Sequence, residues 1–373
     1  MGKCHVPLRE LCGALVLIAA LAATGCGSKD DRKAAYFDRG MELYDAGNYQ
    51  KARLEFRNVL QIDPKHIRAR YHLALTEEKR QNWQAAFENY SAVLQLDAQN
   101  VDARIRLGGI YLLAGAPRKA LDEAQAALEL QGLNAEALVL RAAAMARLGR
   151  RDEGINDAKA ALAADSANGK ARGLLAMFYA DAGQVDEAVA VIEDGIAANP
   201  EDPELRIVLA QVYERAGADA RMTETLAAIV ELEPKNIEHR LRLYRAHQQA
   251  GQLELAEASL RRVIDIDPTR VDTQLTLVSF LLRHRGADSA EQQLRAFIAQ
   301  APEAYRLQFG LARLYGATER TDDMVAVYRD IIESNGTRAD GLSARRFLAE
   351  YYLDNGQYDL ALVLIEEVLA ENP

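Results

Sequence analysis

The chain has 373 residues, enough for two or three compact domains or for one long repetitive array. Its 55 acidic and 45 basic side chains give a formal net charge of −10, which argues against nucleic acid as the main partner because polyphosphate binding needs a basic face. All three cysteines lie at or before position 26, so we expect neither a disulfide nor a thiolate metal cluster in the body of the chain.

The N-terminal residues 1–25 have the pattern of a secretory signal peptide. Lys3 and Arg9 lie in a short basic start, the apolar segment LCGALVLIAALAA follows at residues 11–23, and small residues lead to Cys26. The apolar run of roughly 13–15 residues falls short of the ~20 that a helix needs to span a bilayer. Residues 26–32 continue with polar side chains and predict a flexible tether.

The segment Ala23-Thr24-Gly25-Cys26 resembles the lipobox of bacterial lipoproteins, although Ala23 stands where leucine is commoner. The resemblance implies that Cys26 becomes the first mature residue and carries acyl groups such as palmitate on its sulfur and amine. Several acyl chains anchor a protein stably to a membrane, whereas one binds marginally. The resemblance also implies a location in the bacterial envelope, facing the periplasm. The outer membrane is favoured over the inner one, because Gly27 is not the aspartate that retains such proteins at the inner membrane.

Residues 33–373 repeat at an interval of 34 residues, and we expect about ten blocks with a three-residue slip near residues 336–341. The blocks begin at Lys33, Ile67, Val101, Ala135, Gly169, Pro203, Ile237, Val271 and Tyr305, and near Leu342. One position holds leucine in most blocks: Leu73, Leu107, Leu175, Leu209, Leu243, Leu277, Leu311 and Leu348. Apolar residues three and four apart predict two amphipathic helices per block, and blocks must stack to bury both apolar faces.

Glycine and proline mark the limits of the predicted helices. A glycine between the halves of a block predicts a turn with positive φ, at Gly47, Gly115, Gly149, Gly183, Gly217, Gly251 and Gly356. Proline closes several blocks because it cannot continue a helix. The slip, in the segment Asn335–Gly341, predicts a longer loop.

The fourth block, residues 135–168, departs from the pattern. Arg141 replaces the leucine, Gly154 replaces an alanine, and no proline closes the block. The block is also rich in alanine and buries less apolar area per residue, so we predict that it is the softest block.

Four segments resemble the first helix of the tetratricopeptide repeat: RIRLGGIY, RGLLAMFY, RIVLAQVY and RRFLAEYY, which begin at Arg104, Arg172, Arg206 and Arg345. Arginine replaces the large apolar residue that usually opens this segment, but its stem can lie on the core while the guanidinium stays in water. The resemblance implies an all-α fold, a right-handed superhelical solenoid of about ten 34-residue helix-turn-helix repeats. It also implies that the first helix of each repeat lines a concave groove that binds protein or peptide segments.

Carried over position by position, the partner-binding groove would include Phe37, Met41, Tyr44, Tyr71, Leu75, Ile105, Leu112, Val139, Met177 and Ile207. Such an apolar and aromatic groove suits an amphipathic helix or an extended peptide. The alternative, which the sequence leaves open, is that these residues pack between neighbouring helices, particularly Phe37, Tyr71 and Ile105.

Farther along the chain the same face turns polar and basic, at Gln211, Arg245 and Arg313. The carboxylate clamp of lysines and asparagines known in the family is not expected at the N-terminal end, because only Arg106 fits it among the corresponding residues.

The sequence contains no catalytic constellation. Its histidines form no His-Glu-x-x-His pair, and His239 and His247 are too far apart on one predicted helix to share an ion. It has no nucleophile elbow, phosphate loop or dinucleotide fingerprint. We therefore expect no enzymatic activity, no cofactor, no metal and no small-molecule substrate.

These patterns predict a membrane-anchored periplasmic scaffold or adaptor for protein partners, in envelope assembly, exopolysaccharide export or surface-protein sorting. The block openings Arg-x-x-Leu-(Ala/Gly) resemble those of exopolysaccharide- and exosortase-associated repeat lipoproteins. Two alternatives fit the same patterns. One is an accessory or regulatory region of a longer envelope enzyme or secretion complex, whose catalytic part lies beyond Pro373. The other is a cytosolic scaffold whose N-terminus is only an apolar helix.

Overall fold

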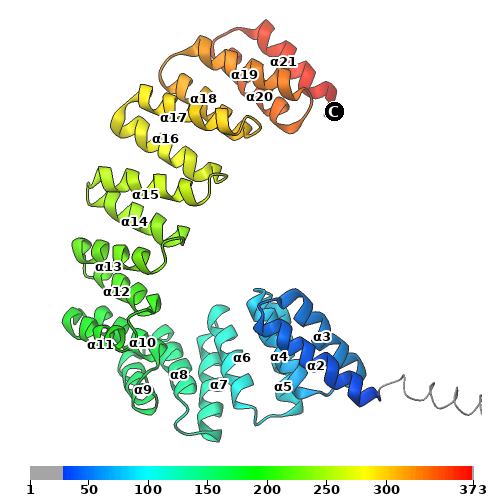
Figure 1. Cartoon of the computed structure of the whole chain (residues 1–373), viewed down its shortest axis with the longest axis vertical. Coiled ribbons are helices and arrows are strands. Elements are labelled where there is room, and N and C mark those ends of the chain that lie inside the picture. Colours follow the sequence, from blue (N-terminus) through cyan, green and yellow to red (C-terminus); the bar gives the residue numbers. More distant parts are fainter. Residues whose placement is uncertain (1–27, 372–373) are drawn as a thin grey trace, which may run out of the picture. The chain divides into compact units, whose positions relative to one another are not determined.

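The computed structural model describes residues 28–371, so the expected signal segment and Cys26 lie outside the described residues. This described part contains twenty α-helices and no β-strand. Figure 1 shows the helices in chain order. The predicted all-α class is therefore confirmed. The helices form two compact units, the first ending at Ala198 and the second beginning at Asn199.

The first unit consists of five antiparallel helix pairs. Their bounds are α2 Lys29–Asp45, α3 Tyr49–Ile62, α4 Ile67–Lys79, α5 Trp83–Leu96, α6 Val101–Leu113, α7 Pro117–Leu130, α8 Ala135–Arg147, α9 Arg151–Ala164, α10 Gly169–Asp181 and α11 Val185–Ala198.

The second unit also consists of five pairs. Their bounds are α12 Pro203–Arg215, α13 Asp219–Leu232, α14 Ile237–Gln249, α15 Leu253–Ile266, α16 Val271–Arg285, α17 Ala287–Gln300, α18 Tyr305–Ala317, α19 Thr321–Asn335, α20 Ala339–Asp354 and α21 Tyr358–Glu371.

Helix starts follow the interval seen in the sequence. Each first helix from α4 to α18 begins at the first residue of a 34-residue block, and the second helices from α3 to α19 begin at the same interval. Within each unit every helix packs against the next one along the chain, so the repeats stack. Stacking buries the apolar faces that a single helix pair would leave in water.

The three additional residues of the slip lengthen helices instead of a loop. α19 ends at Asn335 and α20 begins at Ala339, so only residues 336–338 connect them. Gly336 turns the chain with a φ of 53°, and its carbonyl accepts a hydrogen bond from the Arg345 guanidinium. The longer loop expected for Asn335–Gly341 is therefore wrong, because helical structure continues from Ala339 onward.

Caps and turns fix the helix limits. The Asn100 side chain accepts a hydrogen bond of 3.0 Å from the Ala103 amide at the start of α6. Glycine at the seven predicted turn positions has φ between 65° and 78°, so this prediction is confirmed. Gln81 and Glu319 hold the same turn position with φ of 58° and 57°, although neither is glycine.

Small residues let the helices of a pair approach closely. Gly40 on α2 leaves space for the Phe56 ring of α3, because a Cβ at position 40 would lie 2.6 Å from a ring carbon. One position of the second helices holds a fully buried alanine in most repeats: Ala52, Ala86, Ala120, Ala188, Ala256, Ala290 and Ala361. The core of each unit therefore runs between first and second helices.

Candidate partner-binding groove

The first unit contains a hollow of about 580 Å³, lined by α4, α5, α6, α8 and α10, which we term the first-unit hollow. Tyr71 of α4, Ile105 and Leu112 of α6, and Val139 of α8 line it. They meet because successive first helices stack side by side and present the same face at each 34-residue step. The structure thus brings four of the ten sequence-predicted groove residues together.

The other predicted residues lie elsewhere. Phe37 is only 8% exposed, and its ring packs 5.9 Å from that of Phe56, so it belongs to the core. Met41 and Tyr44 are half-buried against the same cluster, and Leu75 is half-buried against the next one. These four residues contribute to packing, as the alternative allowed.

The last two predicted residues lie outside the first-unit hollow. Met177 is half-buried on α10. Ile207 belongs to the second unit, where it lines a hollow of about 340 Å³ with Gln211 and Arg245. Arg313 lines a further hollow of about 570 Å³ in the same unit. The basic residues picked out in the sequence therefore line surface hollows of the second unit.

Two large apolar residues at the first-unit hollow were missed by sequence reasoning. Trp83, the only tryptophan of the chain, begins α5 and is 43% exposed. Leu113 ends α6 and is 68% exposed. Trp83 lies on a second helix, which the repeat pattern does not assign to the groove. Leu113 directly follows Leu112, a predicted groove residue. The two consecutive leucines were therefore the sequence feature that could have indicated Leu113.

The charges that line the first-unit hollow are nearly balanced. Arg106 lies 3.8 Å from Glu78, and Lys170 lies 3.2 Å from Glu136, while Asp102 adds a third carboxylate. Burial raises the pKa of Glu78, although Arg106 opposes the shift. Burial alone would lower the pKa of Arg106, but Glu78 and nearby tyrosines raise it overall. The pair therefore presents a fixed cation beside a carboxylate that costs more than usual to ionise.

The lining of the first-unit hollow is suited to binding a partner segment. Within residues 28–371 no group of three or more His, Cys, Asp or Glu side chains could hold a metal ion. Two of the histidines have structural contacts: His66 caps α4 by accepting a hydrogen bond of 3.0 Å from the Ala69 amide, and His247 lies 2.7 Å from the Gln252 side chain. No helix of this described part combines the length and apolar character that crossing a bilayer requires.

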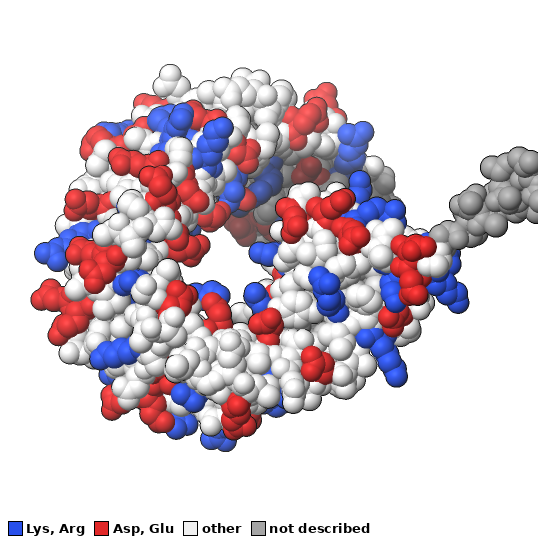
Figure 2. Space-filling model, turned by 60° about the horizontal axis from the view of Figure 1, so that its bottom comes forward, with Lys and Arg blue, Asp and Glu red and all other residues white. Residues whose placement is uncertain are grey.

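Charged side chains of both signs are interspersed on the face shown in Figure 2. That face has no continuous run of basic side chains of the kind that follows a nucleic-acid backbone. Many charges are joined in pairs between helices, such as Arg104 and Glu123 at 2.8 Å. The charges on the face drawn there are therefore mixed in sign.

Sequence comparison gives the family of the repeats. Models of the tetratricopeptide repeat match residues 37–101, 145–212, 245–270 and 275–337, and together cover more than half of the chain. A search of curated proteins found no significant match.

Several solved structures are similar in fold. A thermophilic tetratricopeptide repeat protein of Thermus thermophilus is 26% identical, with 48% of this chain and 98% of that chain covered and a TM-score of 0.43. MamA 41-end from Desulfovibrio magneticus RS-1 is 17% identical, with 45% and 94% covered and a TM-score of 0.41. The Cut9–Hcn1 hetero-tetramer of APC/C is 14% identical, with 71% and 52% covered and a TM-score of 0.46.

Proposed function

The chain is a tetratricopeptide repeat protein, and from that premise we propose that it is a scaffold that holds a protein or peptide segment in the first-unit hollow. Proteins of this family generally mediate protein–protein interactions. The observation that carries the proposal is the pairing of a stacked apolar floor with two exposed apolar residues, Trp83 and Leu113, at its rim. Large apolar side chains exposed beside a hollow are typical of binding surfaces.

The lining suggests what the partner segment should offer. Tyr71, Ile105 and Leu112 provide an apolar floor for one or two large side chains of an amphipathic helix or an extended peptide. Arg106 and Lys170 already have carboxylate neighbours, so the hollow has little net charge to attract a highly charged ligand. We infer that apolar contact dominates the affinity and that charge sets the orientation of the segment.

Photo-crosslinking tests this function in the full chain. A photoreactive amino acid in place of Leu113, 68% exposed, should form a covalent adduct with one discrete partner. The same replacement at Leu54, 55% exposed on α3, serves as the control and should not. The substitution Tyr71→Ala should weaken the Leu113 adduct while helicity is retained. Equal adducts at both positions, or none at Leu113, would contradict the proposal.

We further propose that the scaffold is tethered by lipid on Cys26 to a bacterial membrane and faces the periplasm, with the outer membrane favoured over the inner one. The work of such a tethered scaffold would be envelope assembly, exopolysaccharide export or surface-protein sorting. This part of the proposal is supported by the signal-like segment 1–25 and the lipobox resemblance at Cys26. The flexible tether expected over residues 26–32 is wrong for its second half, because α2 already begins at Lys29. The shorter tether would keep the first unit close to the membrane.

Metabolic labelling tests the anchor. Labelled palmitate should enter the wild-type chain and the control Cys12→Ala, whereas Cys26→Ala should remain unlabelled and unprocessed. A Cys26→Ala protein that still takes up the label would rule out this anchor and leave the binding proposal untouched.

A further inference from the structure

The hollow of about 570 Å³ in the second unit, here the second-unit hollow, has an aromatic floor between α16, α18 and α20. The Phe347 ring lies 5.8 Å from Phe309 and 6.1 Å from Tyr328, and Phe309 lies 6.2 Å from Tyr328. Leu275 reaches this floor because Gly310 has no side chain, and a Cβ there would lie 2.7 Å from a Leu275 methyl carbon.

Two arginines of the second-unit hollow have no charged partner. Arg313 on α18 and Arg346 on α20 are exposed, and neither forms an ion pair or a hydrogen bond with any residue of the described part. The Arg346 guanidinium lies 4.8 Å from the centre of the Phe347 ring, which holds it over the floor. Arg306, the third arginine of the lining, pairs with Asp272 instead.

No acidic side chain of the described part forms an ion pair with either of these two arginines. The nearby Glu350 acts on Tyr328 instead: burial raises the pKa of Tyr328, Arg313 opposes the shift and Glu350 adds to it. Asp340 is the only carboxylate among the described lining residues, and it lies in the first turn of α20, where the helix dipole favours a negative charge. The first-unit hollow differs, because both of its cations have a carboxylate within 4 Å.

We propose that the second-unit hollow binds an anionic peptide segment. Carboxylates of the segment accept paired hydrogen bonds from the planar guanidinium groups of Arg313 and Arg346, a geometry that carboxylates match well. An apolar side chain between these carboxylates rests on Phe309 and Phe347. The inference goes beyond the proposed function, because it assigns a second site with a different ligand class and does not depend on the first-unit hollow.

Fluorescence anisotropy with the full chain tests the proposal. The probe is a dye-labelled ten-residue peptide with glutamates around a central leucine, measured at low salt. Arg313→Gln with Arg346→Gln should weaken its binding roughly tenfold or more, because two charge-assisted contacts are lost. The control Arg57→Gln with Arg118→Gln removes the same charge from two exposed arginines of α3 and α7 and should leave binding unchanged. Equal weakening in the control would show a general charge effect and overturn the site.

Three further measurements separate this ligand class from others. The same peptide with glutamine in place of glutamate should not bind, and equal binding would overturn the anionic requirement. A ten-nucleotide single-stranded DNA should bind more weakly than the acidic peptide, and tighter binding would favour nucleic acid instead. Trp83 fluorescence should stay constant on binding, since Trp83 belongs to the first-unit hollow. A change in Trp83 fluorescence would place the peptide in the first-unit hollow and refute the proposed location. Failure of the Leu113 crosslink alone would not refute the second-unit site.

Discussion

Arg141 of α8 donates two hydrogen bonds of 2.7 Å to the carboxylate of Asp157 on α9, in the repeat whose leucine position Arg141 occupies. Asp157 is buried, with 10% of its side chain exposed, while 24% of the Arg141 side chain is exposed. The hydrogen bond to the Asp157 carboxylate raises the pKa of Arg141, so the guanidinium stays charged at neutral pH. In the fourth repeat a salt bridge with two hydrogen bonds thus replaces the apolar contact that the leucine makes between the helices of other repeats.

Removing one partner of this pair should cost more than removing both. We expect Asp157→Ala to destabilise the first unit by about 2–3 kcal/mol, because it leaves Arg141 partly buried and unpaired. Arg141→Leu with Asp157→Ala should recover most of the loss, because it restores the leucine of the other repeats. Hydrogen exchange of α8 and α9 and urea unfolding measure both variants. A double variant no more stable than Asp157→Ala would show that leucine does not fit this repeat.

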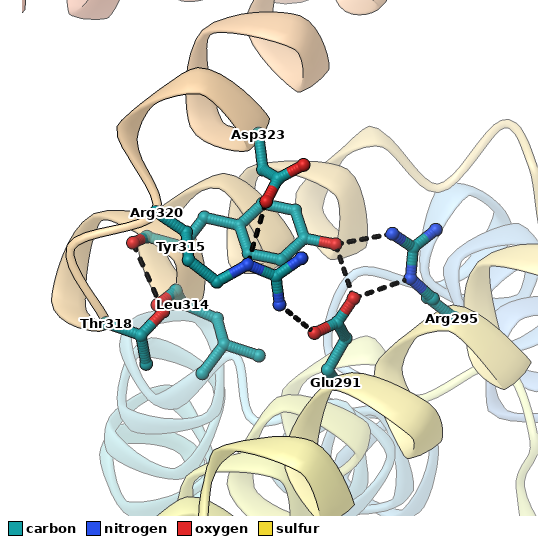
Figure 3. A network of polar contacts seen from close by, with 7 residues as sticks. All are labelled: Glu291, Arg295, Leu314, Tyr315, Thr318, Arg320 and Asp323. Atoms are coloured by element: carbon teal, nitrogen blue, oxygen red, sulfur yellow. Dashed lines mark hydrogen bonds and ion pairs between the residues drawn. The ribbon is translucent and has the colours of Figure 1, made fainter.

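Glu291 of α17 is the centre of a polar network that joins two repeats of the second unit, shown in Figure 3. Its carboxylate accepts hydrogen bonds of 2.6 Å from the Tyr315 hydroxyl and 2.9 Å from Arg295, and another from Arg320. Arg320 also reaches Asp323 at 2.7 Å. The Tyr315 hydroxyl, then the two arginines, lower the pKa of Glu291 to about 2.

Stability of the second unit should therefore fall in acid. A glutamate with a lowered pKa stabilises the folded chain above its ordinary pKa of 4.5, and this contribution disappears as the pH falls toward 2. Glu291→Gln should cost about 1–2 kcal/mol at neutral pH and should flatten the pH dependence in that window. Glu254→Gln is the control, because Glu254 is largely exposed and lies 3.2 Å from Arg285. It should change neither the stability at neutral pH nor the pH dependence. Parallel pH profiles for wild type and Glu291→Gln would contradict this reading.

The sequence predicted the helix starts well because the determinants are local. A capping side chain such as Asn100 and a glycine turn act within a few residues, so they recur with the 34-residue interval. The structure of the three-residue slip was predicted less well. An insertion in the sequence does not by itself show whether the additional residues lengthen a loop or a helix. The Gly336 turn and the contact from Arg345 that stabilises it depend on residues brought together by folding.

The groove could be predicted only in part, because burial depends on neighbours that differ between repeats. Phe37 and Tyr71 hold the same repeat position, yet the rings of His66 and His72 lie 5.5 and 5.7 Å from Phe37 and cover it, while Tyr71 lines the hollow. Likewise, the lack of partners at Arg313 is a property of the three-dimensional neighbourhood, which no spacing in the sequence encodes.

Replacing Gln81, in the turn before α5, by glycine should stabilise the folded chain. Its φ of 58° is unfavourable for a side chain, whereas glycine adopts it without strain. We expect Gln81→Gly to stabilise the chain by about 0.5–1 kcal/mol after the larger entropy loss of glycine on folding is included. The converse change Gly183→Gln, at a φ of 78° with open space around the position, should destabilise by a similar amount. Thermal unfolding measures both, and a Gln81→Gly variant less stable than wild type would contradict the argument.

Gly154 of α9 and Gly109 of α6 should respond to alanine in opposite directions. A Cβ on Gly154 would lie 2.4 Å from a carbon of the Phe178 ring, whereas nothing lies within 4 Å of a Cβ on Gly109. We expect Gly154→Ala to destabilise the first unit by about 1–3 kcal/mol because of overpacking. Gly109→Ala should stabilise it by about 0.5–1 kcal/mol through helix propensity.

A rescue experiment separates the clash at Gly154 from other causes. Phe178→Leu shortens the side chain that fills the space, so its combination with Gly154→Ala should cost less than the sum of the two single changes. Denaturant unfolding of the wild type, the two single variants and the double variant gives the coupling directly. If the two costs simply add, the Phe178 ring is not what excludes a side chain at position 154, and the departure of this repeat from the alanine pattern would need another cause.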